Sequence, residues 1–159
     1  MKTTVAIVGL GSRGRITYAP FASLHPDKME ITAAADIDPG ALRETAETYH
    51  IPEERCFASA ELLLAQPKVA DAVFICTQDR DHVSQALTAL ERGYHILMEK
   101  PISPDPTECR QLLEASKKYD RKIVVCHVLR YTPFFSKMKE LIASGIIGDV
   151  VTIQAIENV

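Results

Sequence analysis

Short apolar runs alternate with longer amphipathic segments along the chain. The apolar runs span residues 5–8, 30–35, 72–76, 94–98 and 123–126. Within each run the apolar residues are nearly continuous rather than alternating with polar ones, which is typical of strands that are buried on both faces. The runs therefore predict the strands of a parallel sheet that helices cover on both sides.

The segments between these runs carry the signals that begin and end helices. Asp38-Pro39 combines an N-cap with a proline at the first helical position, and predicts a helix that runs to about Tyr49. Asp105-Pro106-Thr107-Glu108 is close to a capping box, and Thr132-Pro133 begins a further helix that Gly145 ends. Another helix is predicted by apolar residues that share one helical face and precede Gly93, namely Val83, Ala86, Leu87 and Leu90.

This alternation predicts an α/β fold over residues 1–146, a doubly wound parallel sheet of the Rossmann type. The pattern changes near the end of the chain, because apolar residues then alternate along residues 150–157. Residues 147–159 are therefore expected to form the first strand of a second, α+β substrate domain. A sheet strand with no partner after it is an aggregation liability. We therefore expect the fold to be truncated where that second domain begins.

Composition narrows the range of functions. The 159 residues are 47% hydrophobic and 25% charged, the balance of a globular protein that can bury a core of its own. The formal net charge is −3 and there is no basic run, which argues against nucleic acid or an anionic membrane as a partner. The apolar runs are too short for a membrane helix or a signal peptide. The four cysteines form no CxxC pair or metal cluster, so we expect free thiols and a cytoplasmic protein.

Three of the seven glycines lie close together in the segment Gly9-Leu10-Gly11-Ser12-Arg13-Gly14. The segment follows the first strand and begins a helix, which is the context that a dinucleotide-binding G-x-G-x-x-G turn requires. The first glycine allows the tight turn, the second lets the backbone approach a pyrophosphate, and the third lets helix and strand pack closely. Backbone N–H groups and the helix dipole would then hold the phosphate. Ser12 could add a hydroxyl, and Arg13 is either a further phosphate contact or an ordinary surface arginine.

An acidic residue, Asp36, follows the second strand, 22 residues after Gly14. A carboxylate there can accept hydrogen bonds from both ribose hydroxyls of NAD, and it repels the 2′-phosphate of NADP. NAD is therefore the expected cofactor and NADP the less favoured one, although Arg43 on the next helix could soften this preference. The alternative is a glycine-rich turn that serves packing alone, with Asp36 as a solvated loop acid.

Further polar segments follow three later strands, at the edge of a doubly wound sheet where ligands bind. These segments are Thr77–His82, Glu99-Lys100-Pro101 and His127–Tyr131. Lys100 beside Glu99 can polarise a hydroxyl or carbonyl, or pass a proton, but it could equally be half of a surface ion pair. His82 stands at a helix start, where it either faces a nicotinamide or caps the helix. Lys100–Pro101 is also a bond at which a cis peptide can form.

Taken together, these segments resemble the cofactor domain of the glucose–fructose oxidoreductase / inositol dehydrogenase / MocA family over nearly the whole chain. The most specific part is Glu99-Lys100-Pro101, which matches the family's E-K-P after the fifth strand. One departure is Gln78, where the family usually has a proline after the threonine. The resemblance also rests on residues 5–14, 33–38, 77–82, 130–133 and 147–150.

The resemblance implies a nicotinamide-dependent oxidoreductase that acts on a secondary hydroxyl of a sugar, cyclitol or related polyol by hydride transfer. It implies that Lys100 is the catalytic residue that touches the substrate and the nicotinamide, and that Glu99 holds Lys100 or the nicotinamide ribose. Thr77 and His82 would line the path of the cofactor, and Ile37 would lie near the adenosine. The family's catalytic aspartate and histidine belong to the second domain, which usually also forms the dimer sheet. This chain alone is therefore expected to be inactive, and the whole protein to be a homo-oligomer.

Two other classes of function remain open from the sequence. A non-catalytic dinucleotide-binding or redox-sensing module would bind the nucleotide without turnover. A flavodoxin-like or methyltransferase-type protein would share the sheet, but that class does not explain Glu99-Lys100-Pro101.

Overall fold

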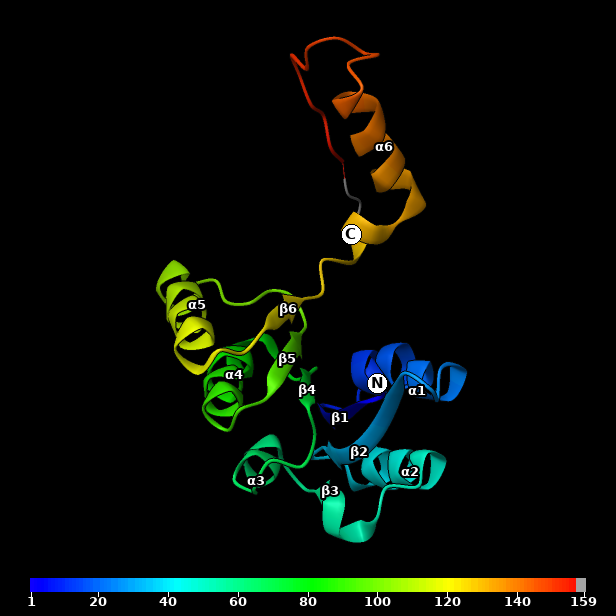
Figure 1. Cartoon of the computed structure of the whole chain (residues 1–159), viewed down its shortest axis with the longest axis vertical. Helices are drawn as coiled ribbons and strands as arrows, with labels where there is room; N and C mark the ends of the chain where they lie inside the picture. The colour runs from blue at the N-terminus through cyan, green and yellow to red at the C-terminus, as the bar shows by residue number, and fades with distance from the viewer. Residues whose placement is uncertain (157–159) are drawn as a thin grey trace. The chain divides into compact units, whose positions relative to one another are not determined.

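The chain divides into two compact units, Met1–Cys126 and His127–Val159. The structure, a computed structural model, describes residues 1–156. The larger unit contains the sheet and five helices, and the smaller one contains α6 (Pro133–Ala143), as Figure 1 shows. The expected cofactor domain over residues 1–146 thus spans the boundary between the two units.

Six parallel strands form one sheet in the order β3-β2-β1-β4-β5-β6. This is the strand order of the Rossmann fold, and it reverses direction between β1 and β4. The predicted doubly wound parallel sheet is therefore confirmed. The strands are β1 (Thr3–Val8), β2 (Met29–Ala35), β3 (Cys56–Phe57), β4 (Ala72–Ile75), β5 (His95–Met98) and β6 (Ile123–Val125).

Helices cover both faces of the sheet. In Figure 1, α1 and α2 lie on one side of the strands, and α3, α4 and α5 lie on the other. Right-handed crossovers between parallel strands produce this arrangement. The helices are α1 (Pro20–Leu24), α2 (Pro39–Tyr49), α3 (Ala60–Leu64), α4 (His82–Glu91) and α5 (Pro106–Tyr119).

Alternate residues of β1 belong to two different hydrophobic cores. Ala6 and Val8 pack with residues of α3, α4 and α5, whereas Val5 and Ile7 pack with residues on the side of α1 and α2. All four are at most 1% exposed. Successive side chains of a strand point to opposite faces, so burial on both faces requires the near-continuous apolar run seen in the sequence.

The predicted starts of α2 and α5 are confirmed, because the predicted N-cap residue of each helix accepts a backbone hydrogen bond. The Asp38 side chain accepts a hydrogen bond from the Gly40 backbone N–H at 2.8 Å, and Asp105 accepts one from Thr107 at 2.7 Å. The capping box at α5 is not completed, because Glu108 receives its hydrogen bond from the Ser103 hydroxyl. The Asp105 N–H also donates to Ser103 Oγ, at 2.9 Å, so Ser103 takes the place of the acidic partner.

The hydrophobic pattern did not predict three short elements. β3 has two residues and α3 has five, too few to show a period. After the glycine turn the chain forms a π-helical segment, Ser12–Tyr18, where an ordinary helix was expected. Its wide turn is visible in the hydrogen bond from the Ala19 N–H to the Gly14 carbonyl, 3.0 Å long, which spans five residues.

The smaller unit carries an amphipathic helix and an extended tail. The apolar stripe of α6, which includes Phe134, Met138, Leu141 and Ile142, is at least 38% exposed at each of these positions. A strand was expected near the end of the chain, but the described part of that segment, residues 150–156, forms none. A strand is held by hydrogen bonds to a neighbour, and the described residues of this unit provide no second strand. The rest of the expected strand lies outside the described residues.

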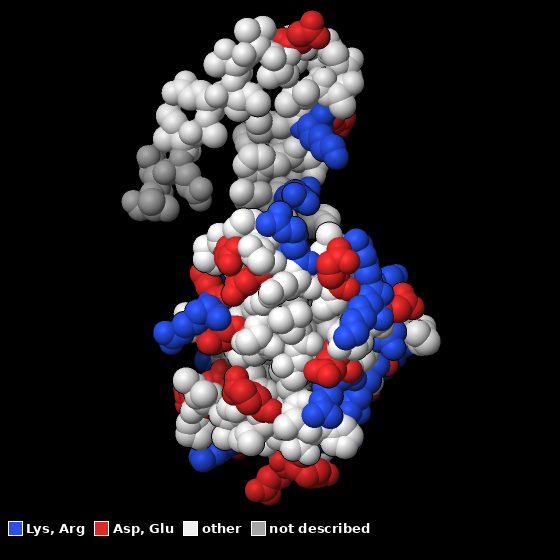
Figure 2. Space-filling model, turned by 90° about the vertical axis from the view of Figure 1, so that its left-hand side faces the viewer, with Lys and Arg blue, Asp and Glu red and all other residues white. Residues whose placement is uncertain are grey.

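The surface and the thiols complete the description. Basic and acidic side chains lie interspersed over the face of the larger unit that Figure 2 draws. Over residues 1–156, no helix has both the length and the apolar character needed to cross a membrane. The four free thiols are those of Cys56, Cys76, Cys109 and Cys126.

Candidate functional site

The glycine turn between β1 and the π-helical segment has the geometry that its sequence predicts. Gly9 has φ +86°, and a Cβ there would lie 2.5 Å from the Cys76 carbonyl oxygen. A Cβ on Gly14 would lie 2.0 Å from the Gly9 carbonyl oxygen. Neither position can accept a side chain, because real Cβ atoms do not approach backbone so closely.

The middle glycine of the turn differs from the other two. A Cβ on Gly11 would meet no atom within 4 Å, so the backbone there faces open space. The Arg15 N–H donates to the Gly11 carbonyl at 3.0 Å and begins the helical segment, whose first N–H groups have no partner within the helix. Ser12 and Arg13 are exposed beside this opening. A bare backbone at a helix start is what a pyrophosphate requires, so these residues fit a dinucleotide.

A cavity of about 460 Å³ opens beside the glycine turn. Its walls come from the turn itself, from the end of β2 and the start of α2, from the start of α3, and from the segment that follows β4. Ile37 lines it and is 86% exposed, so an apolar side chain stands free at the rim. The position of Ile37 agrees with the predicted contact with adenosine, which remains a prediction.

Asp36 is fixed by the backbone at the edge of this cavity. Its carboxylate accepts hydrogen bonds from the Leu10 N–H and, at 2.7 Å, from the Asp38 N–H. Its own N–H donates to the Phe57 carbonyl at 3.1 Å. Each carboxylate oxygen can accept a second hydrogen bond. Asp36 is therefore both oriented and able to accept ribose hydroxyls.

The segment after β4 is tied to the segment after β5 through His82. His82 is fully buried, with Nδ1 2.8 Å from the Pro101 carbonyl and Nε2 3.2 Å from the Thr77 carbonyl. We assign the proton to Nδ1, because a carbonyl only accepts and the contact with Pro101 is the shorter one. The Lys100–Pro101 peptide is cis. The Thr77 hydroxyl donates to Gln85 Oε1 at 2.7 Å.

His82 connects two loops at this edge of the sheet. Both of its ring nitrogens face backbone carbonyls, so the ring joins the loops that carry Thr77 and Lys100. Burial at a helix start does not by itself reveal this partner, because Pro101 lies 19 residues away in sequence. The expected place of His82 along the path of the cofactor remains a prediction.

Glu99 lies buried at the end of β5, with several donors around it. It is 7% exposed, and its carboxylate accepts hydrogen bonds from the Tyr18 hydroxyl and, at 3.2 Å, from the Lys100 backbone N–H. Arg13 Nε lies 3.8 Å from Glu99 Oε1. The Lys100 side chain is exposed, and Lys100 directly follows the anchored Glu99 in the chain.

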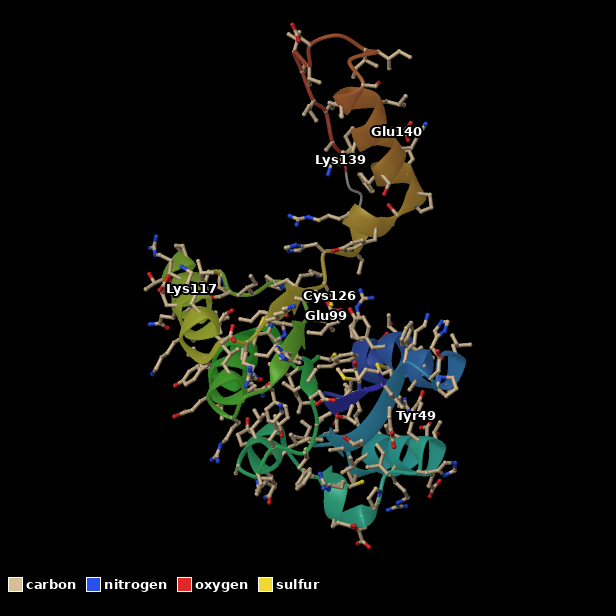
Figure 3. The ribbon with its side chains drawn as sticks, in the orientation of Figure 1. Tyr49, Glu99, Lys117, Cys126, Lys139 and Glu140 are labelled. Carbon is tan, nitrogen blue, oxygen red and sulfur yellow. The ribbon has the colours of Figure 1, made fainter. Side chains whose placement is uncertain are left out.

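Two thiols lie close to this carboxylate. Figure 3 shows Cys126 and Glu99 together at the carboxyl ends of β6 and β5. Burial raises the pKa of Cys76 to about 12, and burial also raises the pKa of Cys126. Burial, together with hydrogen bonds to Cys126 and Glu99, raises the pKa of the Tyr18 hydroxyl. At neutral pH both thiols are protonated, so neither behaves as a reactive thiolate.

The sequence did not single out Arg15, Tyr18 or Gln85. Arg15 directly follows Gly14 and lines the cavity, so its position in the turn was a usable signal. Gln85 stands one turn into α4, where it receives the Thr77 hydroxyl. Tyr18 gave no signal, because its contact with Glu99 depends on the π-helical turn and spans 81 residues of sequence.

These observations define a Rossmann domain with a dinucleotide cradle and a lysine at the same edge of the sheet. Residues 3–127 match the family described as "Oxidoreductase family, NAD-binding Rossmann fold", so the chain belongs to this family, that of glucose–fructose oxidoreductase, inositol dehydrogenase and MocA. The resemblance found in the sequence is thereby confirmed.

Known proteins of this kind are similar over most of the chain. It is 32% identical over 133 residues to the uncharacterized oxidoreductase ORF334 of Rhizobium meliloti. The matched region covers 84% of this chain and 39% of that protein. It is 28% identical to an inositol 2-dehydrogenase of Corynebacterium glutamicum, over 97% of this chain and 45% of that protein.

A solved structure is also similar over most of the chain. The scyllo-inositol dehydrogenase of Lactobacillus casei, with bound NAD(H) and scyllo-inositol, is 25% identical and superposes with a TM-score of 0.83. The match covers 94% of this chain and 43% of that one. The chain thus spans less than half the length of these three relatives.

Proposed function

We propose that this chain is the cofactor-binding portion of an NAD-dependent oxidoreductase that acts on a secondary hydroxyl of a sugar, cyclitol or related polyol. The observation that carries the proposal is one shared edge of the sheet. There the glycine turn and Asp36 lie at the ends of β1 and β2, and Glu99 and Lys100 follow β5. The inositol dehydrogenases among the relatives support the substrate class.

The dinucleotide would be held along this edge by residues that do not need to move. The N–H groups that follow Gly11 would bind the pyrophosphate, with Ser12 and Arg13 beside them. Asp36 would accept the adenosine ribose hydroxyls, and Ile37 would contact the adenine side. NAD, when bound, supplies the hydride acceptor for the oxidation.

Lys100 is the catalytic residue in this proposal. Its exposed ammonium group would donate a hydrogen bond to the oxygen of the reacting carbon and stabilise the negative charge that develops there. Glu99 would orient this segment by accepting the Lys100 N–H, while Tyr18 and Arg13 hold the carboxylate. Thr77 and His82 would act as positioning residues for the two loops.

The intact protein would complete the site from outside the described residues. We propose that residues 147–159 lead into a second domain that forms the substrate wall, and that the assembled enzyme is a homo-oligomer. The greater length of the relatives supports this arrangement. The alternative is a non-catalytic dinucleotide-binding or redox-sensing module, which would bind the nucleotide without turnover of any substrate.

The test is turnover by the intact gene product that contains this chain. NAD reduction would be followed with a panel of inositols and aldoses, for the unchanged protein and for Lys100→Ala. We expect turnover of at least one polyol, and a loss of about 10²- to 10⁴-fold in Lys100→Ala, the range for one positioned proton-transfer group. Lys122→Ala is the control, since Lys122 precedes β6, away from the site. Nucleotide binding without turnover of any polyol, or a fully active Lys100→Ala, would contradict the proposal.

A further inference from the structure

The cavity beside the glycine turn is strongly unbalanced in charge. Four carboxylates line it, those of Asp36, Asp38, Glu61 and Asp81. Among the described residues that line it, Arg15 is the single lysine or arginine. A nucleotide with an additional phosphate would therefore depend on Arg15 for a countercharge.

Arg15 is already engaged in another contact. Its Nη1 donates to Glu44 Oε2 in an ion pair with α2. Glu44 stands three residues after Ala41, which lines the cavity, so the pair lies on the α2 face that borders the cavity. The Glu44 side chain is 67% exposed, and the Arg15 side chain is 31% exposed.

The guanidinium group also has a hydrogen-bond donor that is not used within the described residues. Arg15 Nε is buried and makes no hydrogen bond with any residue in the described part of the chain. A buried donor without an acceptor is unfavourable, so an acceptor oxygen brought by a ligand would be stabilised there. A 2′-phosphate on the adenosine ribose offers such oxygens, because arginine binds phosphate through several N–H groups at once.

We propose that Arg15 and Glu44 together set the preference of this cavity between NAD and NADP. This inference rests on the proposed binding of a dinucleotide. Asp36 disfavours a 2′-phosphate directly, and Glu44 disfavours it indirectly by pairing with Arg15, the one lysine or arginine among the described residues that line the cavity. NADP binding therefore requires Arg15 to leave Glu44, whereas NAD binding leaves the ion pair intact.

Calorimetric titrations of this chain with NADH and NADPH test the proposal, using Glu44→Gln and, as the matched control, Glu47→Gln. Both variants remove one exposed acid from α2, so they change the net charge equally. We expect Glu44→Gln to tighten NADPH binding about fivefold, the size of one exposed charge pair, with little change for NADH. The Glu47→Gln variant should leave the ratio of the two dissociation constants unchanged.

A second variant separates the role of Arg15 from a general charge effect. Adding Arg15→Met to Glu44→Gln should abolish the gain in NADPH affinity, and thermal unfolding would show that each variant is folded. If unchanged chain binds NADH but Glu44→Gln and Glu47→Gln give the same ratio, this inference is overturned and the proposed function stands. If the unchanged chain binds neither nucleotide, the proposed dinucleotide site fails, and the inference fails with it.

Discussion

The two halves of the strand-end edge are built in opposite ways. On the side of β1 and β2, an open cavity of about 460 Å³ is shaped by the backbone of the glycine turn. On the side of β4 and β5, Glu99 and His82 are buried and hydrogen-bonded. The first half has room for a ligand, whereas the second is a packed polar network beneath one exposed lysine. In the proposed function, binding would depend on the shape of the backbone, and the orientation of Lys100 would depend on side chains that hold two loops in place.

Because of this difference, the two halves should be sensitive to different kinds of substitution. The glycine turn tolerates no added volume at two positions, because a Cβ there would overlap backbone atoms. The network around Glu99 is sensitive to the loss of a donor, since a buried carboxylate without partners is unfavourable. Substitutions that add volume should therefore damage the first half, and substitutions that delete a hydrogen bond should damage the second.

The largest effect is expected from adding one methyl group to the turn. Gly14→Ala places a Cβ 2.0 Å from the Gly9 carbonyl oxygen, and should lower the free energy of unfolding by about 3 kcal/mol or more. Urea denaturation measures this change in the free energy of unfolding. Gly11→Ala is the matched control, because its Cβ meets no atom within 4 Å. The control should fold normally yet bind NADH more weakly, since its methyl group occupies the open space. Equal stability of the two variants would mean that the turn is not tightly packed.

The next effect concerns discrimination between nucleotides. Asp36→Ala removes a carboxylate that accepts the Leu10 and Asp38 N–H groups and is proposed to accept ribose hydroxyls. NADH binding should weaken about 10- to 100-fold, the range for hydrogen bonds to a charged group, and NADPH binding should weaken less. Calorimetric titration with each nucleotide measures the two dissociation constants.

Asp38→Ala is the control for that measurement. It also removes an acid from the cavity and deletes the N-cap of α2, which should cost about 1 kcal/mol of stability. The ratio of NADH to NADPH affinity should change less in Asp38→Ala than in Asp36→Ala. The same ratio in both variants would argue that Asp36 does not contact the ribose.

The smallest effect is expected in the packed half. Tyr18→Phe deletes the hydroxyl that donates to Glu99 and should lower the free energy of unfolding by about 1 kcal/mol at neutral pH. The control is Tyr131→Phe, because Tyr131 is 78% exposed and should change stability little. A Tyr18→Phe variant as stable as the control would show that the contact with Glu99 contributes nothing to the fold.

The same pair of variants gives a pH dependence. Burial raises the Tyr18 pKa above its ordinary value of 10.0, so the folded state holds the phenol proton more tightly than the unfolded state does. This contribution to stability is fully present below pH 10.0 and is lost as the pH rises above it. The unchanged protein should therefore lose stability above that pH more steeply than Tyr18→Phe does. Parallel loss in both proteins would contradict the assignment.

The sequence was sufficient for most of the sheet and for the backbone half of the site. The apolar runs predicted five strands, because burial on both faces leaves a pattern that local sequence records directly. The turn at Gly9 and Gly14 was predictable for the same reason, since only glycine fits there. The start of α2 at Asp38 was predictable because capping is a contact between near neighbours in sequence.

The packed half could not be predicted to the same degree. The contact of Tyr18 with Glu99 and that of His82 with Pro101 join residues that lie 81 and 19 positions apart. Such contacts depend on how strands and helices are placed, and no local pattern records them. The hydrogen bonds of the π-helical turn that carries Tyr18 span one residue more than those of an α-helix, a difference that hydrophobic periodicity does not resolve.

The central claim is that this edge of the sheet binds NAD through the glycine turn and Asp36. Its most direct test is a calorimetric titration of the unchanged chain with NADH and, separately, with NADPH. The account predicts saturable binding of one NADH per chain and weaker binding of NADPH. Binding of neither nucleotide, or tighter binding of NADPH than of NADH, would contradict it.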